Sequence, residues 1–114
     1  MPLIRITTNI NIDSPTLNTA LKIVSESVAT MLGKPESYVM LDYQRSPHML
    51  FAGTGESTAY IELKSLGLEE NKTTEFSKML CTLLNDQFGI QGNRIYIEFS
   101  NPERHMWGWD KRTF

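Results

Sequence analysis

The chain repeats one pattern of apolar residues twice, and this repetition limits the folds that it can adopt. In each half, a short strand-like segment precedes a helix-like segment and a second strand-like segment. Gly33 and Gly89 end the equivalent helices, Tyr38 and Tyr96 begin the equivalent strands, and the halves are offset by roughly 57 residues. A duplicated β-α-β unit is expected to form a four-stranded mixed sheet with both helices on one face.

The two helix-like segments show the spacing of three and four residues that is typical of amphipathic helices. Ser14 followed by Pro15 predicts an N-cap and a first helical position, and Gly33 and Gly89 predict the helix ends. The lone Cys81 lies beside the second apolar stripe, so we interpret it as a small buried residue rather than a nucleophile. The stripes are Leu17, Ala20, Leu21, Val24, Val28, Met31 and Leu32, and then Phe76, Leu80, Leu83, Leu84 and Phe88.

Four segments predict strands because they are rich in β-branched, aliphatic or aromatic residues. They are, approximately, Leu3–Thr8, Tyr38–Tyr43, Ala59–Leu66 and Arg94–Phe99. The expected fold is therefore a single α+β domain over residues 1–114. We expect the sheet face without helices to be apolar and to be buried by oligomerisation, for which a homotrimer is one symmetric solution.

Composition and charge exclude several classes of protein. The chain has 114 residues, a net charge of −2, and acidic and basic residues interspersed along its length. A nucleic-acid partner is not expected without a concentrated basic surface, and no apolar run approaches the roughly 18 residues of a membrane span. The single cysteine excludes an internal disulfide and a one-chain cysteine zinc site, so we expect no metal. No secretory signal is evident, and a reducing cytoplasm is the default location.

Several short blocks then occur in a characteristic order and at a characteristic spacing. They are Pro2 after Met1, Gly33-Lys34-Pro35 with Tyr38-Val39, Lys64-Ser65-Leu66-Gly67, Lys78-Met79-Leu80-Cys81, Arg94-Ile95-Tyr96-Ile97, and Gly108-Trp109 with Thr113-Phe114. With these blocks the chain resembles the macrophage migration inhibitory factor family of the tautomerase superfamily over essentially its whole length. The resemblance implies a homotrimer with three active sites at subunit boundaries. It also implies keto–enol tautomerase activity on phenylpyruvate-like aryl α-keto acids, without a cofactor.

The resemblance assigns the chemistry to the start of the chain. Tautomerisation needs a base of suitable pKa and a positive group near the developing oxyanion. The amine of Pro2 would be the base, and then the acid, once Met1 is removed. Burial and a neighbouring cation lower the pKa of an amine, and Lys34 would be that cation. Lys34 would also bind the substrate carboxylate, assisted by the backbone around Ser65 and Leu66.

The resemblance also assigns an aromatic pocket. Tyr38, Trp109 and Phe114 would line a site that fits an aryl ring. Tyr96 would be supplied by the neighbouring subunit and would close that site. Tyr96 and Trp109 would otherwise be interpreted as core or interface residues.

The chain departs from the family pattern at three positions near this pocket. Glu98 stands where well-studied members have asparagine, and its carboxylate could pair with Lys34 and repel an anionic substrate. Lys64 stands where a histidine is usual and could offset that charge. Trp107 replaces a smaller aliphatic residue and is expected to narrow the mouth of the pocket.

Two alternatives to an isomerase follow from the same features. The chain could be a cytokine-like or host-modulating signalling protein with a secondary or vestigial pocket, secreted without a signal peptide and bound by a receptor protein. It could also be a purely structural β-α-β trimer. Pro2 and Lys34 favour retained chemistry, because a pure binding module needs neither residue.

Overall fold

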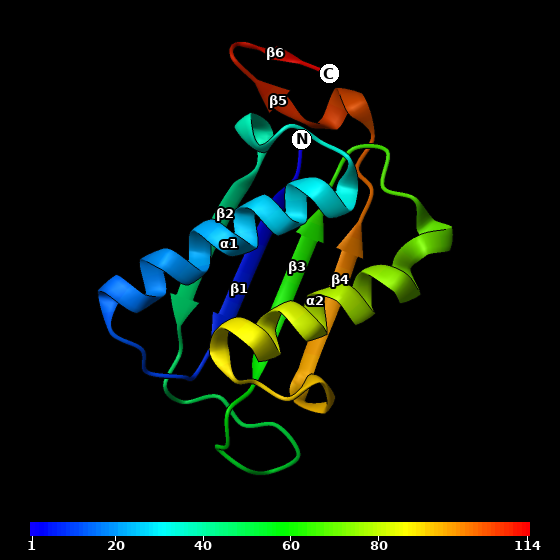
Figure 1. Ribbon diagram of the computed structural model, residues 1–114. Coiled ribbons are helices and arrows are strands. Elements are labelled where there is room, and N and C mark those ends of the chain that lie inside the picture. The colour runs from blue at the N-terminus through cyan, green and yellow to red at the C-terminus, as the bar shows by residue number, and fades with distance from the viewer.

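The computed structural model describes residues 1–114 and places both helices on one face of a four-stranded sheet (Figure 1). The sheet has the order β2-β1-β3-β4, in which β1 pairs with β2 and β3 with β4 in parallel, while β1 and β3 are antiparallel. The predicted α+β class and mixed sheet are confirmed. The elements of this layer are β1 Leu3–Thr8, α1 Ser14–Leu32, β2 Met40–Arg45, β3 Ala59–Lys64, α2 Thr73–Phe88 and β4 Ile95–Ser100.

The ends of α1 follow from local side-chain and backbone chemistry. The prediction that Ser14 is the N-cap is wrong, because the carboxylate of Asp13 accepts the Thr16 N–H at 3.1 Å and so caps the helix. Pro15 lies in the first turn, where a missing N–H leaves no helical bond unmade. Gly33 has φ 65° and ends the helix in the left-handed conformation, as predicted.

The predicted strands agree with the structure to within two residues, and the largest difference is at β2. Tyr38 was expected to begin that strand, but it lies in the short 3-10 turn η1, Glu36–Tyr38, and β2 begins at Met40. The turn is closed by the Val39 N–H, which donates to the carbonyl of Glu36 at 2.9 Å. Because of this turn, the Tyr38 side chain is not part of the regular alternation along the strand.

The hydrophobic core lies between the helices and the sheet. Alternate residues of β1 and β3 point into it, as the strictly alternating burial of both strands shows. Both predicted helical stripes contribute, and Val24, Val28, Leu80 and Leu84 have no exposed surface. No helix combines the length and the apolar composition needed to cross a bilayer.

The opposite face of the sheet corrects one expectation. It was predicted to be apolar, but the β1 residues on this face include Arg5 and Thr7, and their neighbours are also polar. Arg5 forms ion pairs with Asp42 at 3.1 Å and with Glu62 at 3.5 Å. Exposed apolar area on this face is limited to its ends, at Met40 and Tyr96, so it gives a weaker argument for oligomerisation than expected.

A small two-stranded hairpin, β5 Gly108–Trp109 with β6 Arg112–Thr113, follows the sheet and was not predicted. It lies at the same end of the molecule as the N-terminus (Figure 1). Asp110 and Lys111 form its turn with φ values of 47° and 67°. Glycine usually marks such a turn, so the sequence carried no signal for it.

The core placement of α2 predicts a difference between adjacent residues. Leu80→Ala should lower the free energy of unfolding by about 2–5 kcal/mol, because it leaves a cavity in the core. Met79→Ala is the matched control, since Met79 is 49% exposed and should cost much less. Urea unfolding at one fixed protein concentration measures both losses. Equal losses would contradict this orientation of α2.

Candidate active site

A cavity of about 270 Å³ lies at the end of the sheet where β1 begins. Three segments that are distant in sequence meet there: the start of the chain, the turn that leads into β2, and the C-terminal hairpin. The first two are adjacent because β1 and β2 are parallel and Leu3 pairs with Met40. The lining residues are Met1, Pro2, Leu3, Ser37, Tyr38, Val39, Met40, Trp107, Gly108 and Trp109.

Pro2 is held at the base of this cavity. Its side chain is fully buried, and its carbonyl accepts the Met40 N–H at 3.0 Å. This bond extends the pairing of β1 with β2 by one residue, so the main chain at Pro2 is fixed by the sheet. The first residues of the chain therefore have a defined position rather than a frayed one.

The N-terminal amine lies in surroundings that disfavour its charged form. In this chain the amine belongs to Met1, and its pKa is lowered from the ordinary value, chiefly by burial. The positive charges of Lys34 and Arg104 lower the pKa further. Each effect destabilises the ammonium form relative to the neutral amine.

Lys34 reaches the neighbourhood of Ser65 and Leu66, with which the family resemblance grouped it, and none of the three lines the cavity. The Lys34 ammonium donates to the carbonyl of Leu66 at 3.1 Å. The position of Lys34 follows from the left-handed Gly33, after which the Lys34 N–H bonds the carbonyl of Ala29 at 3.0 Å. Ser65 is buried, and its hydroxyl has no hydrogen-bond partner.

The three predicted aromatic residues form one continuous wall. The rings of Tyr38 and Trp109 meet edge to face, with centroids 6.0 Å apart. The ring of Phe114 stacks on Trp109, also at 6.0 Å, with an interplanar angle of 13°. Tyr38 and Trp109 line the cavity directly, and Phe114 supports Trp109. Trp107 also lines the cavity, and its narrowing of the cavity mouth stays a prediction.

Arg104 was not identified from the sequence. Its Nε donates to the main-chain oxygen of Phe114 at 3.2 Å, and its carbonyl accepts the Trp107 N–H at 3.3 Å. Arg104 therefore connects both ends of the C-terminal segment that forms the aromatic wall. No spacing pattern marks it, because it reaches the site through a short 3-10 turn, Arg104–Met106.

Tyr96 and Glu98 lie elsewhere in the protomer. Tyr96 pairs with Tyr60, which pairs with Thr7, so Tyr96 is level with the far end of β1. With ordinary strand geometry this places it about 13 Å along the sheet and about 10 Å across it from Leu3. A single protomer therefore does not bring Tyr96 to its own Pro2.

Glu98 is on the same open face as Tyr96. Its carboxylate lies 3.3 Å from the hydroxyl of Tyr60. It forms no ion pair with Lys64 in the protomer, whose strand position pairs with Ser100. The expected offset of its charge by Lys64 therefore stays a prediction.

Comparison with known proteins identifies the family. Residues 1–114 match the family profile described as Macrophage migration inhibitory factor. The chain belongs to this family. It is 35% identical to the macrophage migration inhibitory factor homolog of Trichuris trichiura, with 100% of both chains covered. It is 37% identical to the homolog of Brugia malayi, over 100% of this chain and 99% of the relative.

Solved structures agree with this identification. The macrophage migration inhibitory factor homologue from Prochlorococcus marinus superposes with a TM-score of 0.89, at 38% identity and over 98% of each chain. The factor from Trichinella spiralis superposes with a TM-score of 0.89, at 31% identity, over 98% of this chain and 99% of that structure. The resemblance drawn from the sequence blocks is confirmed.

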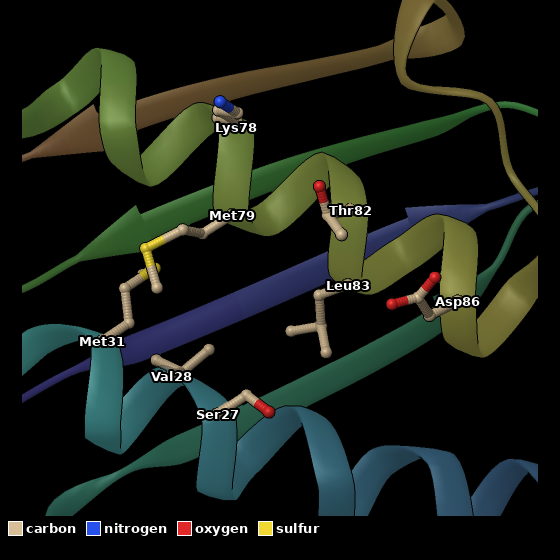
Figure 2. A pocket seen from close by; sticks show the side chains of 8 residues that line it. All are labelled: Ser27, Val28, Met31, Lys78, Met79, Thr82, Leu83 and Asp86. Carbon is tan, nitrogen blue, oxygen red and sulfur yellow. The ribbon is translucent and has the colours of Figure 1, made fainter.

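This member of the macrophage migration inhibitory factor family has a second concavity, a groove of about 360 Å³ between α1 and α2 (Figure 2). The side chains of Met31 and Met79 point toward one another across it, above Val28. Its charged residues, Lys78 and Asp86, both come from α2. The groove lies on the outer side of the helices and is separate from the cavity at Pro2.

The surroundings of the amine predict the effect of removing one cation. Lys34→Ala should raise the pKa of the N-terminal amine, because the ammonium form then loses a repulsive neighbour. NMR titration of protein labelled at the first residue measures this pKa. Lys22→Ala, which removes an exposed lysine of α1, should leave the pKa unchanged. An unchanged pKa in Lys34→Ala would show that the lysine charge does not act on the amine.

Proposed function

We propose that this protein is a homotrimeric keto–enol tautomerase that acts on phenylpyruvate-like aryl α-keto acids. The amine of Pro2 is the base after removal of Met1. One observation carries the proposal: the start of the chain and the rings of Tyr38 and Trp109 line one cavity, and the charge of Lys34 acts on the N-terminal amine. Membership of the macrophage migration inhibitory factor family supports it further.

In the proposed reaction, the neutral amine of Pro2 takes a proton from the carbon next to the keto group. The electron pair of that C–H bond forms the enolate, and the protonated amine then returns the proton to the enolate oxygen, which yields the enol. The proton count balances, and no oxidant or cofactor is needed. The lowered pKa of the Met1 amine supports this role, because the same buried and cationic surroundings would also lower the pKa of a Pro2 amine.

Lys34 is proposed to hold the substrate carboxylate. Its ammonium already lies within bonding distance of the Leu66 carbonyl, so it is directed toward the Ser65–Leu66 segment. Tyr38 and Trp109 would contact the aryl ring of the substrate. A cavity of about 270 Å³ is just below the range of small-molecule sites, and a second protomer would enclose it further.

The position of Tyr96 supports the homotrimer. Tyr96 is 67% exposed and lies at the opposite end of the sheet from Pro2. We propose that each protomer contributes Tyr96 and the adjacent Glu98 to the cavity of a neighbouring protomer. The carboxylate of Glu98 would then meet an anionic substrate and weaken its binding, an effect that Lys64 would offset.

A signalling function is the alternative. It is favoured by the names of the relatives, which include macrophage migration inhibitory factors of Xenopus tropicalis, at 32% identity, and Meriones unguiculatus, at 31%. In that case the protein acts on a receptor, and turnover at the Pro2 cavity is secondary or absent. Secretion without a signal peptide belongs to this alternative, whereas a cytoplasmic location suits the enzyme alone.

The proposed function depends on the free amine of Pro2. Protein whose mass shows that Met1 is removed should convert phenylpyruvate, and kcat/KM should rise with pH through the amine pKa, which is lower than that of an ordinary amine. Pro2→Gly should reduce activity by about 10² or more, since its primary amine lacks the rigid ring. Protein that retains Met1 should be folded but almost inactive, because its Pro2 nitrogen is an amide without basicity.

Pro15→Gly is the matched control, since Pro15 is exposed and lies in the first turn of α1, outside the cavity and outside the loop between β2 and β3. Its activity should equal that of the unchanged protein. Full turnover by protein that retains Met1 would exclude the Pro2 amine as the base. Absence of turnover in every form would favour the signalling alternative.

A further inference from the structure

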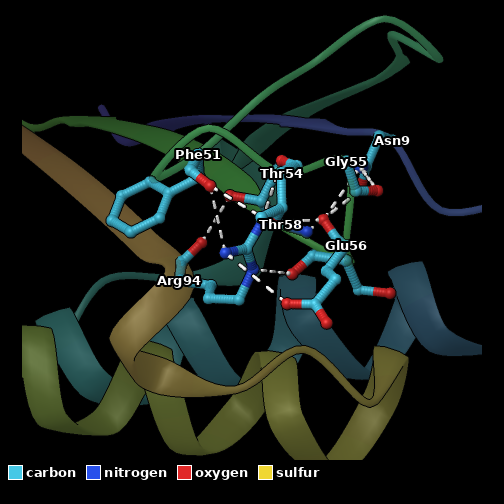
Figure 3. A network of polar contacts seen from close by, with 8 residues as sticks. Asn9, Phe51, Thr54, Gly55, Glu56, Thr58 and Arg94 are labelled. Carbon is cyan, nitrogen blue, oxygen red and sulfur yellow. Dashed lines mark hydrogen bonds and ion pairs between the residues drawn. The ribbon is translucent and has the colours of Figure 1, made fainter.

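Arg94 forms hydrogen bonds with the main chain of the loop between β2 and β3 (Figure 3). Its guanidinium donates to four carbonyls: Ser57 at 3.0 Å, Phe51 at 3.1 Å, Glu56 at 3.1 Å and Thr54 at 3.3 Å. Its side chain is only 13% exposed although it lies at the end of the sheet. Arg94 therefore acts as the internal support of residues 46–58.

The contacts with carbonyls, rather than an ion pair, explain why this residue is an arginine. The nearest carboxylate is that of Glu56, at 4.0 Å, and the Glu56 side chain is 77% exposed. Such an exposed pair stabilises a protein little. A planar guanidinium with five N–H donors can bond several carbonyls at once, whereas the three donors of a lysine ammonium lie on a single atom.

The loop that Arg94 supports has a conformation that needs support. Phe51 and Thr54 exchange two main-chain hydrogen bonds, at 3.0 and 3.1 Å, around a tight turn. The turn contains Ala52 with φ 53° and Gly53 with φ 77°. Alanine rarely adopts a positive φ, and such residues persist only where the surrounding structure determines them.

The turn places the ring of Phe51 between two residues of the chain segment that enters β4. The guanidinium of Arg94 lies over this ring, 5.2 Å from its centroid. The ring of Tyr96 meets it edge to face, with centroids 5.0 Å apart. Phe51 is the only aromatic ring in contact with Tyr96, which is otherwise exposed in the protomer.

We propose that Arg94 is a positioning residue for the active site of the neighbouring protomer. By binding the loop carbonyls, Arg94 keeps the Phe51 ring in contact with Tyr96. This contact fixes the Tyr96 side chain, which closes the cavity of the neighbouring protomer. The inference rests on the proposed function, in which Tyr96 contacts the aryl ring of the substrate. A Tyr96 ring that is already ordered need not lose conformational freedom when substrate binds.

This role predicts a change in binding rather than in chemistry. Pro2 and Lys34 come from the neighbouring protomer, whose cavity Tyr96 closes. Loss of the Arg94 guanidinium should therefore leave kcat within about twofold. KM for phenylpyruvate should rise about two- to tenfold, the effect expected from one aromatic contact. KM for an α-keto acid without an aryl group, such as pyruvate, should not change.

Two variants separate the effect of the Arg94 guanidinium from that of the Phe51 ring. Arg94→Lys keeps the positive charge but loses the planar guanidinium. Phe51→Leu keeps the loop carbonyls that Arg94 binds but loses the aromatic ring. Arg45→Lys is the matched control, because Arg45 donates to one carbonyl, that of Ile10, at the same end of the sheet. Light scattering and thermal unfolding verify that each variant keeps its assembly and fold.

The ring of Tyr96 can be observed without any activity. In protein labelled with 3-fluorotyrosine, a Tyr96→Phe variant identifies the ¹⁹F resonance of Tyr96. This resonance should move toward that of free fluorotyrosine in Arg94→Lys and in Phe51→Leu, but not in Arg45→Lys. An unmoved resonance in both variants, or equal losses for aryl and non-aryl substrates, would overturn the proposal. A moved resonance in a protein that never turns over phenylpyruvate would support the positioning of Tyr96 and overturn the tautomerase function instead.

Discussion

The register of β1, β3 and β4 is the constraint on which the site depends. Pro2 precedes the first residue of β1, while Tyr96 is level with Thr7 near the end of that strand. Strand geometry cannot bring the two ends of a sheet together within one chain. In the proposed tautomerase, whose site uses both residues, two protomers must therefore contribute to each cavity.

Each half is stabilised by main-chain hydrogen bonds at the end of an element. At the Pro2 end, the left-handed Gly33 directs Lys34 toward Leu66, and Arg104 holds the C-terminal segment through Phe114. At the Tyr96 end, the Arg94 guanidinium donates hydrogen bonds to carbonyls of the loop that precedes β3. The open face between the two ends carries the ion pairs of Arg5 with Asp42 and Glu62.

The sequence predicted what depends on periodicity and on special residues. The apolar stripes, the two glycine helix ends and the order of strands and helices along the chain follow from spacing, and the structure confirms them. Asp13, the hairpin turn at Asp110 and the role of Arg104 were missed, because each depends on a geometry that several residue types can adopt. The family resemblance assigned Lys34, the aromatic residues, Tyr96 and Glu98 to the Pro2 site. The structure places Tyr38 and Trp109 at the cavity, whereas Tyr96 lies at the other end of the sheet.

Subunit complementation tests the shared site most directly. Pro2→Gly and Tyr96→Ala should each have low kcat/KM, and equal amounts unfolded and refolded together should regain activity. Random mixing makes about three-quarters of the trimers mixed, each with one intact site of three, so about one-quarter of the unchanged activity should return. Pro2→Gly refolded with the Pro2→Gly/Tyr96→Ala double variant should regain none. No recovery in verified mixed trimers would contradict a site built from two protomers.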